Sequence, residues 1–352
     1  MNVSKKKVCI VGPYPPIKGG ISQYDEFLTN ELNNHADVTV FSYKRQYPQF
    51  LLKKREQVDA NHSISDCCIS NIDFSLDSIN PLSWVSVLAK IRKIKPDLVI
   101  LPWWVVYWAP MYVVFLSVFR VLNIKTLMLC HNIYEHEDHY IKRAISRIVF
   151  KLANFYLVHS TSERSKLLPL IGGKDYIQHL HPLYEYSAIK DQEIVPRVQD
   201  GRINLLFFGF VRKYKGLDLL LEAMHLLNDD DLHLTIVGEF WAEKNEFHDY
   251  IEQKNIANVS IIDHYVADNE MKNYFLDADV VVLPYRSATG SGVIATAYGY
   301  HKPVLVTNVG GLAEAVENKR TGLIVEPDAE SISSGITWFK HHKGHDFSSE
   351  IS

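Results

Sequence analysis

The sequence predicts an α/β protein built from two doubly wound, Rossmann-like domains. Its 352 residues are more than a single ordinary core needs. In both halves, short apolar runs typical of buried parallel strands alternate with segments of helical periodicity. The alternation stops at residues 186–201, a polar stretch that we interpret as a linker. We therefore expect one domain at residues 1–185 and a second at residues 202–352.

Each element of the first half follows from its periodicity and its flanking turn residues. Expected strands are Lys7–Val11, Val38–Tyr43, Leu98–Leu101, Thr126–Cys130 and Phe155–His159, and expected helices are Ile21–Asn33, Pro81–Lys93, Lys142–Ala153 and Ser162–Leu168. Residues 44–80 are polar and irregular, with one further strand expected near Cys67–Ile72.

The second half repeats the alternation. Expected strands are Ile203–Phe208, His233–Val237, Val259–Ile262, Val280–Leu283, Val304–Val306 and Gly322–Val325, and expected helices are Leu217–Leu227, Glu243–Lys254, Asp268–Leu276, Val293–Gly299 and Ser331–His341. Ligands of such sheets lie beyond the carboxyl ends of the strands. We therefore expect the loops at these ends, in both domains, to face one cleft.

Composition excludes several classes of protein. The net charge is −4, so no basic excess indicates nucleic acid. The four cysteines (Cys9, Cys67, Cys68 and Cys130) lack the spacing of a zinc site or a disulfide framework, which fits a reducing cytosol. The apolar run near the N-terminus is too short for a signal peptide. We expect a cytoplasmic protein, with peripheral contact at the inner face of the cell membrane as an open alternative.

The most hydrophobic segment is Val99–Asn123. It approaches the ~20 apolar residues of a membrane span, but two prolines interrupt it. One interpretation is a core strand followed by a buried helix. A second is a surface that touches a membrane or a lipid-linked acceptor through Trp103, Trp104, Tyr107 and Trp108. A true membrane span is the third.

The loop "GFVRKYKG" follows an expected strand and precedes an expected helix. Arg212 and Lys215 thus lie at a strand end beside a helix N-terminus, an arrangement that suits a diphosphate. A solvated basic turn is the alternative.

The turn "SATGSGV" lies between a strand and a helix. Its glycines let the backbone approach a ligand, and the amides of Ser291, Gly292 and Val293 would face an anion. The alternative is a capping turn in which Ser291 is the N-cap residue.

The first loop, "GPYPPIKGGISQY", places Gly19 and Gly20 at the start of a helix. The pattern is not GxGxxG, so a dinucleotide fold has weak support. A proline-rich surface loop is the alternative to a ligand-binding role.

The segment "LCHNIYEHEDH" gathers histidines and acids after a strand. A metal site is conceivable, but the spacing lacks a rigid helical motif such as HExxH. We expect His131, at the strand end, to bind substrate, with simple packing as the alternative. The Asp229–Asp231 run is interpreted as a solvated turn.

Taken in order, these pieces resemble the large bacterial family of retaining GT-B glycosyltransferases that build envelope polysaccharides and glycolipids ("group 1", or glycosyltransferase family 4-like). The resembling segments are "GPYPPIKGGISQY", "CHNIYEHE", "LLFFGFVRKYKGLDLLLEAM", "LTIVGE", "ADVVVLPYRSATGSGV", "KPVLVTNVGGLAEAV" and "TGLIVEP". The resemblance implies two domains, a UDP- or GDP-sugar donor, a saccharide or lipid-linked acceptor, and a reaction without metal or other cofactor, in which cations and helix N-termini stabilise the departing diphosphate.

The resemblance also implies roles for single residues. Arg212 and Lys215 match the diphosphate-binding pair, and His131 matches a histidine that approaches the donor sugar. The donor and phosphate side is expected to comprise Gly19, Gly20, Ser291, Gly292, Val293, Thr296 and Glu239. The acceptor side is expected to comprise Trp103, Trp104, Asn132 and His136.

The sequence departs from the family pattern at three points. The family carries two glutamates whose places here are Ala288 and Thr296, which identifies the chain with a subset that carries "SATxSGV". Phe210 stands where many members have arginine. The long C-terminal helix that crosses back onto the first domain is expected to be missing or shortened. Two alternatives therefore stay open: a binding or assembly protein without turnover, and a nucleotide-sugar epimerase on the same fold.

Overall fold

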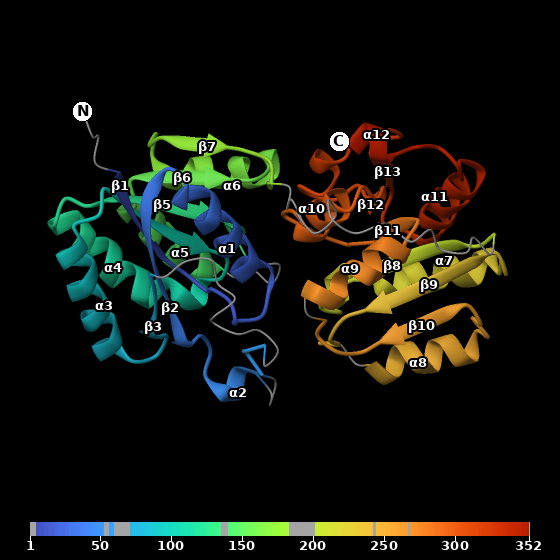
Figure 1. Ribbon diagram of the computed structural model, residues 1–352, viewed down its shortest axis with the longest axis horizontal. Helices are drawn as coiled ribbons and strands as arrows, with labels where there is room; N and C mark the ends of the chain where they lie inside the picture. Colours follow the sequence, from blue (N-terminus) through green and yellow to red (C-terminus); the bar gives the residue numbers. More distant parts are fainter. Residues whose placement is uncertain are drawn as a thin grey trace. The chain divides into compact units, whose positions relative to one another are not determined.

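A computed structural model describes residues 5–52, 56–59, 71–134, 140–182, 201–241, 244–266 and 268–351. The chain divides into two compact units, Met1–His179 and Leu180–Ser352 (Figure 1). The division falls within the last residues of the expected first domain, six positions before its expected end at residue 185. The expected linker, residues 186–201, lies outside the described residues except for its last position.

Unit 1 is built on a seven-stranded parallel sheet with the order β3-β2-β1-β4-β5-β6-β7. The strands are β1 (Lys6–Val11), β2 (Ala36–Arg45), β3 (Ile72–Asp77), β4 (Leu98–Trp103), β5 (Lys125–Cys130), β6 (Phe155–Val158) and β7 (Tyr176–Gln178). The helices are α1 (Gly20–Asn33), α2 (Gln49–Leu52), α3 (Pro81–Ile94), α4 (Ala109–Val121), α5 (Tyr140–Leu152) and α6 (Thr161–Ile171), with a 3₁₀ turn, η2 (Val106–Trp108).

Local sequence explains where these helices begin. Asn80 caps α3 by accepting from the Leu82 amide, and Pro81 occupies the first turn, where its missing N–H costs nothing. Ser160 caps α6 in the same way. The helices α3, α4, α5 and α6 pack in succession, while α1 packs against β2.

Unit 2 is built on a six-stranded parallel sheet with the order β10-β9-β8-β11-β12-β13. The strands are β8 (Ile203–Phe208), β9 (Leu232–Val237), β10 (Val259–Ile262), β11 (Val280–Leu283), β12 (Val304–Thr307) and β13 (Gly322–Val325). The helices are α7 (Leu217–Leu227), α8 (Lys244–Gln253), α9 (Asp268–Asp277), α10 (Gly292–Gly299), α11 (Ala329–His341) and α12 (Ser348–Ile351), with 3₁₀ turns η4 (Lys213–Lys215) and η5 (Ala313–Ala315). Two doubly wound α/β units are thus confirmed.

Most differences from the expected elements involve short pieces. The strand expected near Cys67–Ile72 is β3, which begins only at Ile72; the Cys67–Ser70 part of that expectation lies outside the described residues. The edge strand β7 has three residues, too few for an alternating pattern to be recognised. The strands at the centre of both sheets are buried on their two faces, so their apolar runs gave clear signals.

The hydrophobic segment Val99–Asn123 forms β4, η2 and α4, which confirms the interpretation as a core strand and a buried helix. Trp103 and Trp108 are each 1% exposed, so the interpretation of these two side chains as a surface was wrong. Trp104 and Tyr107 are partly buried and pack on the same core. Within the described residues, no helix has both the length and the apolar character needed to cross a bilayer.

Candidate functional site

In unit 2 the candidate site lies at the carboxyl ends of four adjacent strands, β9, β8, β11 and β12. Their loops are held together by glycines. A Cβ on any of three glycines would overlap a carbonyl group of a neighbouring loop: Gly216 meets Pro284, Gly238 meets Gly209, and Gly310 meets Ala288. All three glycines have positive φ, the region that favours glycine. The loops therefore form one closely spaced frame.

Lys215 ends the 3₁₀ turn after β8, and its side chain is directed into this frame. The residue is 8% exposed, and its Nζ lies 5.4 Å from the centre of the Tyr285 ring. The same Nζ is 2.9 Å from the point that a Cβ on Gly209 would occupy. Burial, and then the charge of Arg212, lowers the pKa of Lys215 to about 7.

Arg212 precedes this turn and is exposed. Its guanidinium lies over the Trp241 ring, 4.3 Å from the ring centre, a cation–π contact. Trp241 in turn packs on Phe210, with ring centres 5.1 Å apart. Among the described residues, neither Arg212 nor Lys215 forms an ion pair with a carboxylate. The acid nearest in sequence, Asp218, is paired with Arg286 instead.

The first turn of α10 also approaches Gly209. A Cγ of Val293 is 3.9 Å from the point that a Cβ on Gly209 would occupy, so Lys215 and this helix start converge there. The Ser291 hydroxyl accepts from the Val293 amide at 3.2 Å. Ser291 is thus the N-cap residue, and the capping interpretation is confirmed. Capping takes up one amide of the first turn and leaves the anion-binding interpretation untested.

The two positions that lack glutamate are mostly enclosed. Ala288 is buried, and its carbonyl oxygen accepts from the Gly311 amide at 3.2 Å. The Thr296 hydroxyl donates to the Gly292 carbonyl oxygen at 3.0 Å, so only its lone pairs remain for a ligand. Glu239 follows β9 and is half-buried, and its backbone carbonyl accepts from the Val211 amide, beside Arg212.

In unit 1 the expected residues gather at the carboxyl ends of β1 and β5. Gly19 has φ 125° and Gly20 begins α1, and a Cβ at either position would meet open space. His131 follows β5 and donates its amide to the Trp103 carbonyl oxygen at 2.8 Å. The glycine loop and His131 are joined through Tyr24 of α1, whose ring centre is 4.9 Å from that of His131.

His159 completes this group and was not singled out from the sequence. It follows β6, and its ring centre is 5.3 Å from Tyr24 and 5.9 Å from His131. Burial lowers the pKa of His159, so the ring is held neutral at neutral pH. The available signal was its position: β6 is the strand beside β5, and a polar residue directly after it lies next to His131.

A buried carboxyl group lies under the glycine loop. Asp25 of α1 is 0% exposed, and neither carboxylate oxygen has a hydrogen-bond partner within the described residues. A Cβ on Gly12, directly after β1, would overlap Oδ2 of Asp25. Burial raises the pKa of this carboxyl group well above its usual range. Composition and spacing gave no signal for it.

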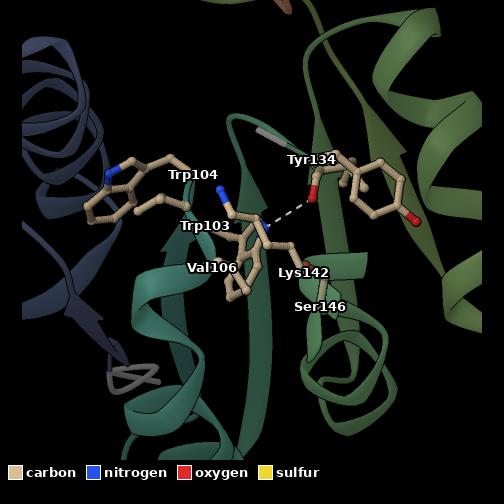
Figure 2. Close-up of a pocket in the computed structure, with 8 residues that line it drawn as sticks. Trp103, Trp104, Val106, Tyr134, Lys142 and Ser146 are labelled. Carbon is tan, nitrogen blue, oxygen red and sulfur yellow. Dashed lines mark hydrogen bonds between the residues drawn. The ribbon is translucent and has the colours of Figure 1, made fainter. Parts of the chain in front are cut away.

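Trp103 and Trp104, the tryptophans expected on the acceptor side, line a small pocket in unit 1. Its walls come from β4, the following turn, the loop after β5, and α5: Trp103, Trp104, Val105, Val106, Ile133, Tyr134, Lys142 and Ser146. Figure 2 shows Lys142 and Ser146 of α5 close to Trp103, whose indole N–H donates to the Ile133 carbonyl oxygen at 3.5 Å. The space open to the centre of a water molecule is about 10 Å³, room for about one water.

Two of the sequence-based candidates stand apart from this pocket's lining. Asn132 follows His131, with its amide directed to the Trp103 carbonyl oxygen at 3.4 Å. His136 lies outside the described residues, as do the acids and the histidine at 135–139. In the described ranges, no three His, Cys, Asp or Glu side chains gather as metal ligands.

Comparison with solved structures shows the fold. A glycosyltransferase from Rickettsia africae aligns with a TM-score of 0.72 at 19% identity, covering 99% of this chain and 91% of that one. The Anabaena protein HepE, solved in complex with UDP, aligns with a TM-score of 0.70 at 14% identity, covering 98% and 93%. The two-domain α/β architecture is therefore that of GT-B glycosyltransferases.

Comparison by sequence finds glycosyltransferases that match part of the chain. D-inositol 3-phosphate glycosyltransferase of Paenarthrobacter aurescens is 33% identical over 134 residues, which cover 37% of this chain and 33% of the relative. GDP-mannose:glycolipid 4-beta-D-mannosyltransferase of Xanthomonas campestris is 29% identical over 179 residues, covering 50% and 48%. The matched lengths are thus about a third to a half of these relatives.

A family model agrees with the location of the cationic site. The model described as "Glycosyl transferases group 1" matches residues 189–349, which include Arg212, Lys215 and the first turn of α10. This part of the chain is therefore similar to group 1 glycosyltransferase domains.

Proposed function

We propose that the protein is a retaining, metal-independent glycosyltransferase. It transfers a hexose from a UDP- or GDP-sugar to a saccharide or lipid-linked acceptor in polysaccharide or glycolipid biosynthesis. One relative is named for GDP-mannose and one structural neighbour was solved with UDP, so these two bases are the first to test.

The observation that carries the proposal is the pair of uncompensated cations in the part of the chain that is similar to group 1 domains. Burying a lysine without an opposite charge is costly, and Arg212 adds repulsion. A diphosphate placed between the two cations would remove both costs. The Val293 side chain, in the first turn of α10, approaches the same point beside Gly209 as the Lys215 ammonium group, and a helix N-terminus favours an anion.

In the proposed reaction the bond between the anomeric carbon and the phosphate oxygen breaks, and a bond to an acceptor hydroxyl oxygen forms on the same face. The proton of that hydroxyl passes to the leaving diphosphate. Negative charge grows on the leaving diphosphate. Arg212, Lys215 and the helix start stabilise that charge, the work that a metal ion performs in other transferases. Here they act through preorganised positions, since the glycine-packed loops fix their spacing.

The remaining candidates are assigned to the sugar and the acceptor. His131, with Gly19 and Gly20 beside it, is proposed to approach the donor sugar, and Tyr24 and His159 hold its ring. Trp104 and Asn132 are proposed to line the acceptor side, while the buried Trp103 packs beneath them. With Ala288 in place of a glutamate, selection of the donor sugar falls to other hydrogen-bonding groups.

Ala288 and Thr296 also favour a second candidate: a protein of the same fold that binds a nucleotide sugar without turnover. The two candidates share the diphosphate site and differ only in whether nucleotide is released. An epimerase is disfavoured, because it needs acid or base groups and the enclosed Ala288 offers none.

The first experiment is a thermal-shift panel with UDP, GDP, ADP, CMP, dTDP and their common sugars, with and without EDTA. A ligand at 100 times its dissociation constant stabilises a protein by about 2.7 kcal/mol. We expect a shift with one nucleotide family and no effect of EDTA. No shift with any nucleotide would refute the donor site, and a shift that EDTA abolishes would refute the metal-free mechanism.

The second experiment incubates the stabilising nucleotide sugar with the protein and candidate acceptors and measures free nucleotide. Nucleotide release with a product of retained anomeric configuration supports the transferase. Binding without release in the presence of acceptors supports the binding-only candidate.

A further inference from the structure

The outer helix layer of unit 1 is exposed, apolar and basic. The layer consists of α3, α4 and α5, which pack side by side (Figure 1). We define its outer surface by the exposed apolar side chains that it carries: Leu82, Val85, Val114, Val121, Tyr140, Ile141, Ile145 and Ile148. The most open are Leu82, Val121 and Tyr140, at 79%, 86% and 81% exposure.

Charge on this layer has one sign. The sequence of α3 contains three Lys or Arg residues, α4 contains one and α5 contains four, while none of the three helices contains Asp or Glu. The whole chain has a net charge of −4. Lys90 of α3 is paired with Asp73 at 2.6 Å, whereas Arg147 and Lys151 of α5 form no ion pair among the described residues, so the uncompensated charge of this layer is positive.

Helix α5 shows how the two properties are arranged. Ile141, Ile145 and Ile148 recur at helical spacing and form one exposed stripe, while Ser146, Val149 and Phe150 face the core. Arg143, Arg147 and Lys151 follow at intervals of four residues and form a second exposed row. Exposed isoleucines beside a row of cations are the pattern of a helix that lies in a membrane interface.

We propose that the outer surface of α3, α4 and α5 is a membrane-binding face that docks on an anionic lipid bilayer. The apolar side chains enter the boundary between headgroups and acyl chains, and the cations contact lipid phosphates. Charge complementarity favours lipid over a second copy of this chain, because two such faces would bring like charges together. The proposal does not depend on the identity of the sugar donor.

The test is cosedimentation of the full chain with vesicles of phosphatidylcholine alone or mixed with phosphatidylglycerol. We expect the wild type to pellet with the mixed vesicles, much less with the neutral ones, and less as salt is raised. Two variants separate the contributions of apolar contact and charge: Ile141→Ser/Ile148→Ser and Arg147→Glu/Lys151→Glu. Each is expected to lower partitioning by about 10-fold or more.

Matched controls lie on unit 2. Leu226→Ser removes an exposed apolar side chain, and Lys254→Glu/Lys319→Glu makes the same change of net charge as the α5 charge variant. All substituted residues are exposed, so the melting temperatures should stay near that of the wild type. Both controls are expected to partition as the wild type does.

Three results would overturn the proposal. One is a wild type that stays in the supernatant with both vesicle types. Another is unchanged partitioning of both α5 variants. The last is a concentration-dependent increase in mass that Ile141→Ser/Ile148→Ser abolishes while vesicles remain unbound, which would assign the face to a second copy of this chain.

Discussion

The two units place an acidic and a basic side chain at the same point of their topology. In each, the first strand is followed at once by a glycine, Gly12 after β1 and Gly209 after β8. In each, an ionisable group lies beside the point that a Cβ on that glycine would occupy: the carboxyl group of Asp25 in unit 1 and the amino group of Lys215 in unit 2. Both groups lack an ion pair within the described parts of the chain.

The surroundings give the two groups different roles. Asp25 is sealed from solvent, and burial raises its pKa well above the usual range, which favours the neutral form. Lys215 is 8% exposed, has Arg212 as a neighbour and keeps a pKa of about 7. An ionisable side chain that is buried and closed to solvent has a role in the fold. One that lies beside a second like charge and a helix start has a role in binding a ligand. The predictions below test this distinction.

The largest expected effect is on turnover. Lys215→Ala and Arg212→Ala should each lower turnover by about 10²-fold or more, because each removes a donor that stabilises the departing diphosphate. Rates of nucleotide release at saturating donor measure it. Lys254→Ala is the control, since this exposed lysine precedes β10 and therefore lies at the opposite edge of the sheet. Near-wild-type turnover in both site variants would refute the proposed stabilisation of the leaving diphosphate by these cations.

The next effect is on affinity. A lowered lysine pKa leaves Lys215 charged below about pH 7 and neutral above it. A diphosphate binds the charged form, so its dissociation constant should rise above pH 7, by up to about 10-fold per pH unit. Calorimetric titration with the best nucleoside diphosphate from pH 7 to 9 measures this, in a range where the phosphate is already ionised.

Lys215→Arg is the matched variant for the pH series, because a guanidinium stays charged throughout this range. Its binding curve should be flat between pH 7 and 9. An equally steep curve for Lys215→Arg would assign the pH dependence to another group.

The smallest effect is on stability and concerns unit 1. A carboxyl group with a raised pKa contributes its stability fully below its unfolded pKa of about 3.9, and that stability is lost as the pH rises toward the folded pKa. Asp25→Asn removes the titration. The variant should therefore gain stability relative to wild type as the pH rises from 4 to 7, at a slope of up to about 1.36 kcal/mol per pH unit.

Urea unfolding at pH 4, 5.5 and 7 measures this gain. Asp37→Asn, at an exposed position of β2, is the control and should show no such trend. If Asp25→Asn is less stable than wild type by the same amount at every pH, Asp25 is ionised and held by contacts that the neutral amide cannot replace.

The sequence predicted the strands of both sheets well, because central parallel strands are apolar along their whole length. The bounds of the central strands β8 and β11 follow directly from such runs between turn residues, and the four-residue edge strands β10 and β13 are still apolar enough to be recognised. The same logic fails for β7, whose three residues lie at an edge. It also fails for Trp103 and Trp108, since an aromatic run has the same composition in a core as at an interface.

The candidate site was predictable in its members but less so in their pairing. Arg212, Lys215 and Ser291 could be placed at strand ends from the order of strands and helices. The sequence could not show that Lys215 lacks an acid partner, because Asp218 and Glu239 lie close to it in sequence. Only the folded chain shows that Asp218 pairs with Arg286. His159 was missed for a related reason: its neighbour His131 comes from another strand.

The glycine contacts between the loops of unit 2 affect which positions a mutational scan would find intolerant of substitution. At Gly216, Gly238 and Gly310 an added methyl group would strike main chain, which cannot swing aside as a side chain does. These positions should therefore score as intolerant as Lys215, although none supplies a charged group. Gly290, where a Cβ would meet open space, should accept alanine. The positions that tolerate no substitution would therefore include the residues that space the loops as well as those that bind the ligand. Only substitutions that change charge would distinguish the two groups.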